Sequence, residues 1–284
     1  MKLGMGLPNQ IRNVDPAIIP DWAARAEKAG FSTLASAGRF AYPGLADTVA
    51  LAAAAAVTSS IELISNVLLA PSWPAPLLAK ELAGIDGLSR GRLTVGLGIG
   101  SRQEDFPVEG LPARGLGKRL DADLAVYRDI WSGVPVREST NPAVPAGTRQ
   151  VPILFGGVAE PSFARMASWG TGYLSPAMPA FMVADLFDKA RAAWQATGRA
   201  GAPRLVANVS YAVEDGDAGR ANVADAFSFL PGEVMDMVVA GVAVGAHAIA
   251  EAVASFEQIG ADDLILTPTT TDPDEIERLA DLLN

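Results

Sequence analysis

Eight short apolar runs alternate with helix-like segments along almost the whole chain, and this alternation restricts the fold more than any other feature. The runs begin at Leu3, Ser32, Ile61, Leu93, Pro152, Gly172, Leu205 and Asp263. The first helix-like segment has Asp15 as its N-cap, Pro16 at its first position and Gly30 as its end. A strand followed by a helix, eight times over, predicts a (β/α)8 barrel.

The remaining helices are expected at about 46–58, 76–88, 118–131, 161–169, 179–197, 246–259 and 273–283. Strands that are apolar on both faces suit a parallel sheet covered by helices, although a doubly wound open sheet stays an alternative. A chain of 284 residues with 50% hydrophobic content suits one large barrel. Because no linker-like stretch divides it, we expect one domain over residues 1–284.

Two intervals are longer than a single helix requires. One runs from Ser101 to Val151 and contains a proline-rich stretch, and the other runs from Glu214 to Gly245. In a barrel both would follow strands, the fourth and the seventh. We therefore expect insertions there that rise over the C-terminal face, where barrel sites are built.

The charge of the chain restricts its partners. A net charge of -10 and a pI near 4.6 argue against binding to nucleic acid or to an anionic membrane. The longest apolar run, Val49 to Val57, is too short to cross a bilayer, and the amino-terminal residues do not resemble a signal peptide. Without cysteine there is no thiolate nucleophile or metal ligand. We expect a soluble cytoplasmic protein that acts on a small molecule.

Alternate glycines end the fourth run, in the stretch GRLTVGLGIGSRQEDF. The dinucleotide pattern GxGxxG fails in both registers, because Ser101 and Gln103 stand where its last glycine belongs. Glycines at alternate strand positions remove side chains from one face. Either a flat ligand or an opposing backbone can then approach Gly98 and Gly100.

A second glycine pair, Gly156 and Gly157, ends the fifth run and leads into a short helix with Ser162 in its first turn. The free amides of a helix start favour a phosphate, and Ser162 is either one more donor or an ordinary cap. The single histidine, His247, is expected on a packed or exposed helix face, and no metal-binding pattern is present. With no nucleophile in view, a bound cofactor is expected to carry any difficult chemistry.

The order of motifs resembles the bacterial luciferase-like superfamily of flavin- and deazaflavin-dependent oxidoreductases. The matching segments are AEKAGFSTL, AAAAAVTSSIELISNVLLAP, LAKELAGIDGLSRGRLTVGLGIG, RGLGKRLDADLAVYRDIW, VPILFGG, ARMASWGTGYL and DDLILTPTTTDPDEIERLADLL. They extend over almost the whole length, and the LSxGRLxxGLGxG pattern is the most specific of them. The resemblance implies a (β/α)8 barrel that binds FMN or the deazaflavin coenzyme F-420 over the C-terminal ends of its strands.

The resemblance also implies positions for the cofactor. Gly98 and Gly100 would leave room for the ring system, with Ser101 at its rim. Gly156, Gly157 and Ser162 match the phosphate-side loop of the family. A cis peptide bond that backs the ring is expected between Asn66 and Val67. These residues are the predicted cofactor-binding set.

The chain departs from the family where catalytic groups are usual. After the second strand it has Arg39 and Tyr42 instead of an Asp-His pair, so no histidine acid is available there. Thr171 and Tyr173 replace an aspartate and a tryptophan, and Ala122 replaces the second acid of a DE pair. The polar contacts predicted for catalysis are Arg39, Arg102 and Glu104.

Three functions remain open at the level of the sequence. The first is a flavin- or deazaflavin-dependent oxidoreductase, which performs monooxygenation or hydride transfer on a small organic substrate. The second is a barrel that binds flavin without catalysis, and the third is a barrel lyase or isomerase without a redox cofactor. The resemblance further implies a homodimer packed through helices beside the second and third strands.

Overall fold

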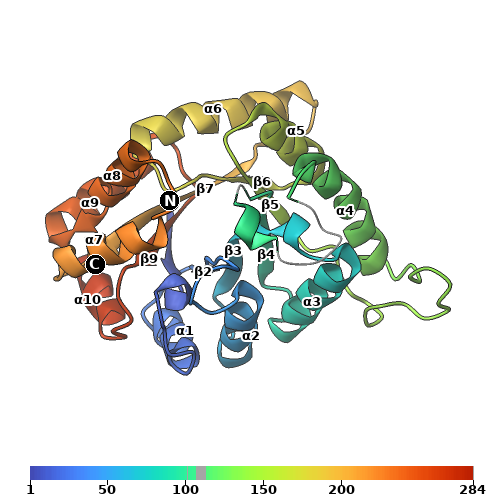
Figure 1. Cartoon of the computed structure of the whole chain (residues 1–284), viewed down its shortest axis with the longest axis horizontal. Coiled ribbons are helices and arrows are strands. Elements are labelled where there is room, and N and C mark those ends of the chain that lie inside the picture. The colour runs from blue at the N-terminus through green and yellow to red at the C-terminus, as the bar shows by residue number, and fades with distance from the viewer. Residues whose placement is uncertain (101, 107–112, 284) are drawn as a thin grey trace.

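The computed structural model of the chain is a closed parallel β-barrel surrounded by helices (Figure 1). It describes residues 1–100, 102–106 and 113–283. The strands are β1 (Lys2–Gly6), β2 (Thr33–Ser36), β3 (Glu62–Leu69), β4 (Leu93–Gly98), β5 (Ile153–Gly156), β6 (Gly172–Leu174), β7 (Arg204–Ala212), β8 (Ala243–Val244) and β9 (Asp263–Pro268). Neighbours pair in the order β1 to β7, then β9, which returns to β1 and closes the ring. The predicted (β/α)8 barrel is confirmed.

Helices follow the strands and cover the outside of the barrel (Figure 1). They are α1 (Ile18–Lys28), α2 (Asp47–Val57), α3 (Ala75–Leu88), α4 (Leu116–Trp131), α5 (Glu160–Trp169), α6 (Ala180–Ala196), α7 (Gly216–Ala226), α8 (Gly232–Ala240), α9 (Gly245–Gln258) and α10 (Glu275–Leu283). Short 3-10 turns η1 (Pro8–Gln10), η2 (Ala70–Ser72) and η3 (Gln103–Asp105) follow β1, β3 and β4. Within the described ranges no helix is long and apolar enough to cross a membrane.

The sequence prediction differs from the structure at three elements. Helix α1 begins at Ile18, because the Asp15 carboxylate accepts the Ala17 N–H in a turn that precedes the helix. The interval after β7 contains two helices, α7 and α8, where the sequence analysis predicted an insertion without a helix. The two residues of β8 pair with Tyr211 and Ala212 at the end of β7 and lie outside the closed ring.

The long interval between β4 and β5 is divided between both ends of the barrel. The described residues that follow β4, residues 99, 100 and 102–106, lie at the C-terminal end, as predicted. The proline-rich part, residues 133–147, follows α4 and therefore belongs to the N-terminal end, so its predicted place over the C-terminal face is wrong. It projects from the barrel as an extended loop (Figure 1) with a bridge between Pro135 and Pro142. Arg149 anchors its return through two hydrogen bonds to Asp86.

Inward-facing side chains fill the barrel in layers, because residues two apart on a strand share a face. The middle layer is a small apolar cluster of its own, made of Ala35, Ile64, Leu154, Leu174, Val206 and Ile265. A separate and larger core lies between the strands and the helices. The middle layer is a solid floor, and any cavity inside the barrel has to lie above or below it.

Below this floor, at the N-terminal end, the barrel is filled by a charged cluster. Arg204 forms two hydrogen bonds to Glu62 at 2.6 and 2.8 Å and two to Asp263 at 2.7 and 2.8 Å. Thr94 donates to Glu62 at 2.8 Å. Every carboxylate in this cluster has a partner, so this end of the barrel is closed.

Candidate functional site

Above the apolar floor, at the C-terminal end, the barrel opens into a cavity of about 230 Å³, which we call the mouth cavity. Its walls contain the next inward-facing residues along several strands. Asn208 lies two positions beyond Val206 of the floor, and Thr267 two beyond Ile265. Because residues two apart on a strand face the same side, one set of inward-facing residues forms the apolar floor and the next set forms the wall of the cavity.

Strand β3 departs from this period at the peptide bond between Asn66 and Val67. That bond is cis, as predicted, and the pairing of β3 with β4 shifts its register between Ser65 and Leu68. Asn66 and Val67 both line the mouth cavity. The role of this bond in backing a cofactor ring stays a prediction.

The predicted glycines make room for protein atoms at several positions. A Cβ on Gly98 would lie 2.8 Å from the Val67 side chain, and one on Gly156 would lie 3.1 Å from it. A Cβ on Gly96 would lie 2.1 Å from the Ser65 carbonyl oxygen. A Cβ on Gly100 would lie 3.2 Å from the side chains of Leu69 and Phe106, and Gly100 does not line the mouth cavity. Close packing of β4 on β3 explains Gly96, while Gly98 and Gly156 accommodate Val67.

The polar side chains of the mouth cavity are uncharged. They belong to Gln10, Asn66, Ser175, Asn208, Ser210 and Thr267. The Asn208 amide donates to the Ser175 carbonyl oxygen at 2.7 Å. The Ser175 hydroxyl is buried and has no hydrogen-bond partner among the described residues. A buried hydroxyl without a partner is costly, so this wall is built to receive a hydrogen-bonding ligand.

The loop after β5 leads from the mouth cavity to the start of α5. Gly156 and Gly157 both line the cavity, and Gly157 has a φ of +121°. A Cβ on Gly157 would lie 2.5 Å from the hydroxyl of Ser162, which is buried in the first turn of α5. The Tyr173 hydroxyl donates to the Gly157 carbonyl oxygen at 2.9 Å. Tyr173, one of the departures from the family pattern, thus holds the loop in place.

This helix start also carries an acid, Glu160, which is exposed and lies 3.9 Å from Lys189. The positive end of the helix dipole favours a negative charge, and the Glu160 carboxylate already provides one where a phosphate would bind. The buried Ser162 and the Gly157 loop are still compatible with a phosphate. The phosphate site at Gly156, Gly157 and Ser162 stays a prediction.

Residues 225–229, the end of α7 and the turn that follows it, form a covering segment over the mouth cavity, which Phe227 lines. Asp225 accepts two hydrogen bonds from Arg12, at 2.8 and 2.9 Å, and one from the Tyr42 hydroxyl. Burial, together with the hydrogen bond to Asp225, raises the pKa of Tyr42 to about 12. The covering segment is thereby tied to the loops that follow β1 and β2.

Two further arginines hold the same segment. Arg39 donates to the Ala226 carbonyl oxygen at 2.6 Å. The guanidinium groups of Arg39 and Arg102 lie 4.7 and 4.0 Å from the centre of the Phe229 ring. Arg102 is also ion-paired to the buried Asp105. Cation–π contacts of this kind contribute about 0.5–2 kcal/mol each, so both arginines stabilise the closed covering segment.

The structure does not bring the three predicted catalytic residues together in the mouth cavity. Arg39 and Arg102 lie above it with protein partners, and Glu104 is exposed on η3. Their catalytic role stays a prediction. Of the cofactor-binding set, Asn66, Val67, Gly156 and Gly157 line the cavity. Gly98 and Ser162 lie behind that wall.

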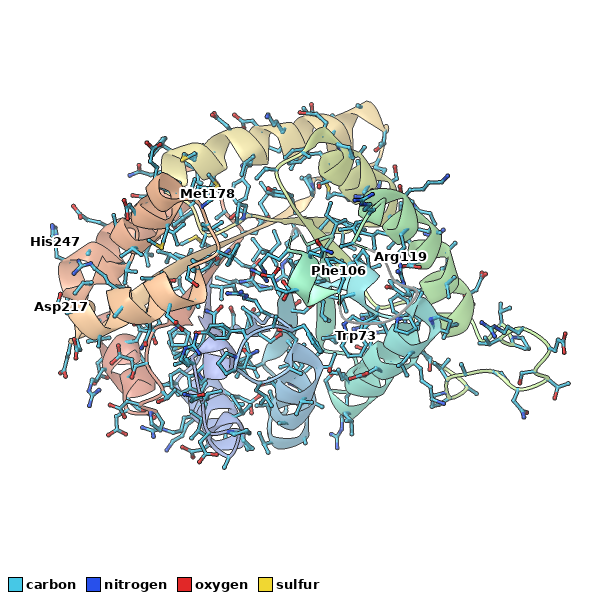
Figure 2. The ribbon with its side chains drawn as sticks, viewed as in Figure 1. Trp73, Phe106, Arg119, Met178, Asp217 and His247 are labelled. Carbon is cyan, nitrogen blue, oxygen red and sulfur yellow. The ribbon has the colours of Figure 1, made fainter. Side chains whose placement is uncertain are left out.

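Other predicted positions lie apart from the site. Ser101 falls outside the described residues. His247 is 89% exposed, lies on the outer surface of α9 (Figure 2), and is 3.4 Å from Glu251. It therefore has no place in the mouth cavity.

Sequence reasoning missed several residues that form the site. Asn208 and Thr267 could have been found by counting two positions along each strand from its apolar centre. Gln10 and Ser175 stand just past the ends of β1 and β6, where loop residues of a barrel line the site. Asp225 carried no such signal, because an acidic residue in the last turn of a helix gives no indication of what it contacts.

A family model for luciferase-like monooxygenases matches residues 1–263 of this chain. The chain belongs to this family. An uncharacterized protein of Mycobacterium tuberculosis is 28% identical over 51% of this chain and 60% of its own length. A second protein of that organism is 30% identical over 56% of this chain and 59% of its own length. The chain thus spans about three fifths of the curated relatives it matches.

Solved structures of low sequence identity share the fold of this family member. An F-420-dependent secondary alcohol dehydrogenase, in complex with an F-420–acetone adduct, has a TM-score of 0.80, 16% identity, and coverage of 99% of this chain and 97% of that one. A monooxygenase from Streptomyces bottropensis has a TM-score of 0.79, 21% identity, and coverage of 100% and 98%. The oxygenating constituent of a Pseudomonas putida diketocamphane monooxygenase, in complex with FMN, has a TM-score of 0.76, 15% identity, and coverage of 99% and 95%.

Proposed function

We propose that this luciferase-like protein is an oxidoreductase that binds FMN or the deazaflavin coenzyme F-420 in the mouth cavity. One observation carries the proposal: the cavity at the C-terminal end of the barrel has an uncharged polar wall that includes a buried hydroxyl without a described partner, at Ser175. The flavin-bound and F-420-bound solved structures of the same fold support it.

The residues present fit such a group. The ring edge of a flavin or deazaflavin offers carbonyl oxygens and an imide N–H, which are uncharged hydrogen-bonding groups. The amides of Gln10, Asn66 and Asn208 and the Ser175 hydroxyl can match both kinds. Val67 and Leu174 supply an apolar surface for a flat ring. Gly157 and Ser162 lie at the α5 start, where a phosphate of the same cofactor could bind.

When bound, the cofactor would supply the redox chemistry, and the chain would supply binding and orientation. The described residues that line the mouth cavity include no Asp, Glu, His, Lys, Arg or Tyr. These residues therefore orient the reactants by hydrogen bonds and do not exchange protons with them. Phe227 excludes water from above, and Arg39 and Arg102 act in this proposal by holding the covering segment closed.

The test is binding of oxidised FMN, reduced FMN and coenzyme F-420 to the purified protein, followed by absorbance. We expect saturable binding, and we expect Asn208→Leu to weaken it at least about tenfold because an oriented donor is lost. The control is Asn222→Leu, whose side chain donates to the Thr269 carbonyl oxygen outside the mouth cavity. Affinity that Asn208→Leu leaves unchanged would contradict the proposed site.

The same titration separates the remaining alternatives. Preference for reduced FMN would favour monooxygenation, and preference for F-420 would favour hydride transfer. A cofactor that binds without turnover of any alcohol, ketone or aldehyde would favour a non-catalytic flavin-binding barrel. Failure of all three cofactors to bind would leave a lyase or isomerase without a redox cofactor. The expected homodimer stays a prediction that analytical ultracentrifugation tests.

A further inference from the structure

A second cavity, of about 300 Å³, lies beside the mouth cavity, and we call it the side pocket. It is enclosed by the loop after β2, the end of β3, η2 and the start of α3. Most of its wall is apolar, with Phe40, Leu68, Leu69, Trp73 and Leu77 as the large side chains. An apolar cavity of about 150 Å³ is enough to bind benzene, so the side pocket can hold a single aromatic ring with a substituent.

The side pocket and the mouth cavity share two strand ends but no residue. Ala37 and Val67 line the mouth cavity, and the residues that follow them, Gly38 and Leu68, line the side pocket. At β3, Val67 packs on the apolar floor inside the barrel and Leu68 belongs to the core between strands and helices, so the two cavities lie on opposite sides of the barrel wall there. A molecule in the side pocket is therefore not placed to react with one bound in the mouth cavity.

One carboxylate, that of Asp47, belongs to this mostly apolar wall. Its Oδ1 is buried, and the groups that approach the carboxylate from within the protein, the Ser36 and Asn9 side chains, are uncharged. Gly38 gives the carboxylate room, because a Cβ there would lie 2.7 Å from Oδ2. Burial raises the pKa of Asp47 to about 6. At neutral pH the group is mostly an anion, and a buried anion that no cation neutralises is costly.

The other charged side chain of the side pocket does not neutralise Asp47. Arg39 also lines the pocket, but its guanidinium donates to the Ala226 carbonyl oxygen and lies over the rings of Tyr42 and Phe229. No ion pair joins Arg39 to Asp47. The pocket thus combines a mostly apolar wall with a carboxylate that has no ion-pair partner among the described residues, and a ligand with an apolar body and a hydrogen-bond donor matches both features.

We propose that the side pocket binds a small apolar molecule, of the size of one substituted aromatic ring, that carries a hydrogen-bond donor facing Asp47. The apolar body lies against Leu69, Trp73 and Leu77, and the donor, a hydroxyl or an ammonium group, reaches the carboxylate. This site is distinct from the proposed cofactor site and does not depend on it. Its occupant contacts Leu68, which follows Val67 of the mouth-cavity wall, so it packs against the same stretch of β3.

The test is calorimetric titration of the protein with three para-substituted toluenes of similar size: 4-methylphenol, 4-methylbenzylamine and 1,4-dimethylbenzene. The Trp73 indole N–H resonance serves as the local reporter. We expect saturable binding of the phenol or the amine, and whichever binds identifies the donor. We expect Asp47→Leu to weaken that probe at least tenfold, and to leave dimethylbenzene unchanged or tighter, because only the donor-bearing probe loses its acceptor.

The control is Asp217→Leu, in the first turn of α7, which Figure 2 shows at the left edge of the molecule, away from Trp73. It should leave all affinities unchanged. A second variant, Leu77→Trp, fills the rim of the pocket from its exposed side and should weaken every probe, whether or not Asp47→Leu folds.

The proposal is overturned if neither donor-bearing probe saturates, if Asp47→Leu binds that probe as the unmodified protein does, or if Leu77→Trp changes nothing. Binding of FMN and F-420 is measured on the same samples. Because the probes are titrated without cofactor, probe binding can be interpreted even if no cofactor binds to the mouth cavity.

Discussion

The two ends of the barrel use polar residues in opposite ways. At the N-terminal end Arg204, Glu62 and Asp263 are charged and fully paired. At the C-terminal end the mouth cavity has uncharged polar groups, and the Ser175 hydroxyl has no described partner. The apolar floor between them is continuous. Polar groups that pair with each other fill the N-terminal end of the barrel, whereas polar groups with free hydrogen-bonding capacity line a cavity at the C-terminal end.

The two ends also differ in the protein segments that cover them. Helices α7 and α8 bring the covering segment over the mouth, held by Arg12, Arg39 and Arg102. Below the closed end, charged side chains satisfy backbone groups instead, as Glu27 does for residues 59–61. The closed end should therefore respond to substitution through stability, and the open end through ligand binding.

Breaking the closed end should have the largest effect. Arg204→Met leaves two carboxylates, Glu62 and Asp263, without their cation in the barrel interior. We expect the free energy of unfolding to fall by about 3 kcal/mol, the usual result of removing one partner of a buried charge cluster. Urea denaturation measures it, with Arg220→Met on the exposed face of α7 as a near-neutral control. If Arg204→Met lowers the free energy of unfolding no more than Arg220→Met does, the charge cluster does not stabilise this end.

Gly157→Ala tests the open end through its backbone. The new Cβ would be strained at a φ of +121° and would lie 2.5 Å from the Ser162 hydroxyl. We expect a loss of about 2 kcal/mol in unfolding free energy and weaker cofactor binding. The control is Gly87→Ala inside α3, where a Cβ meets nothing within 4 Å, and which should stabilise by about 0.5–1 kcal/mol. Equal effects of the two variants would contradict the special role of Gly157.

Glu27 gives the closed end a pH dependence. Burial opposes ionisation, but N–H donors of Ile61, Ser60 and Ser59 outweigh it and lower the pKa of Glu27 from 4.5 to about 2. A lowered folded-state pKa contributes stability above pH 4.5, and that contribution is lost as the pH falls towards 2. We expect Glu27→Gln to cost about 1 kcal/mol at pH 7, a value reduced for its partial exposure.

The measurement is urea denaturation of both proteins at several pH values. The gap between the unmodified protein and Glu27→Gln should narrow below pH 4.5, while the exposed control Glu251→Gln should show no such trend. A gap that stays constant down to pH 3 would remove the assignment.

Ser175→Ala should have the smallest effect on stability. Its hydroxyl is buried without a partner, so its removal should leave the unfolding free energy unchanged or raise it by up to about 1 kcal/mol. The matched variant Ser89→Ala removes a buried hydroxyl that donates to the Asp86 carbonyl oxygen and should destabilise by about 1 kcal/mol. In the proposed function, only Ser175→Ala weakens cofactor binding. A clear loss of stability in Ser175→Ala would mean that its hydroxyl is satisfied inside the protein.

Much of the fold could be predicted because it depends on local pattern. The eight strands of the ring, the family and the cis bond at Asn66–Val67 are all confirmed. The proline-rich stretch was placed at the wrong end because its position depends on whether it precedes or follows α4, which its composition does not reveal. The role of Gly98 also needed the structure, since only contacts show that it faces Val67.

The sequence by itself determined the barrel, because the periods of strands and helices and their alternation permit few other ways to bury these apolar runs. It also determined that the chain has no cysteine and only one histidine. Only the tertiary structure decided that Arg39 and Arg102 hold Phe229, and that Asp47 and Leu77 face one pocket. Such contacts join residues tens of positions apart, and their geometry follows from how the loops pack on the finished barrel.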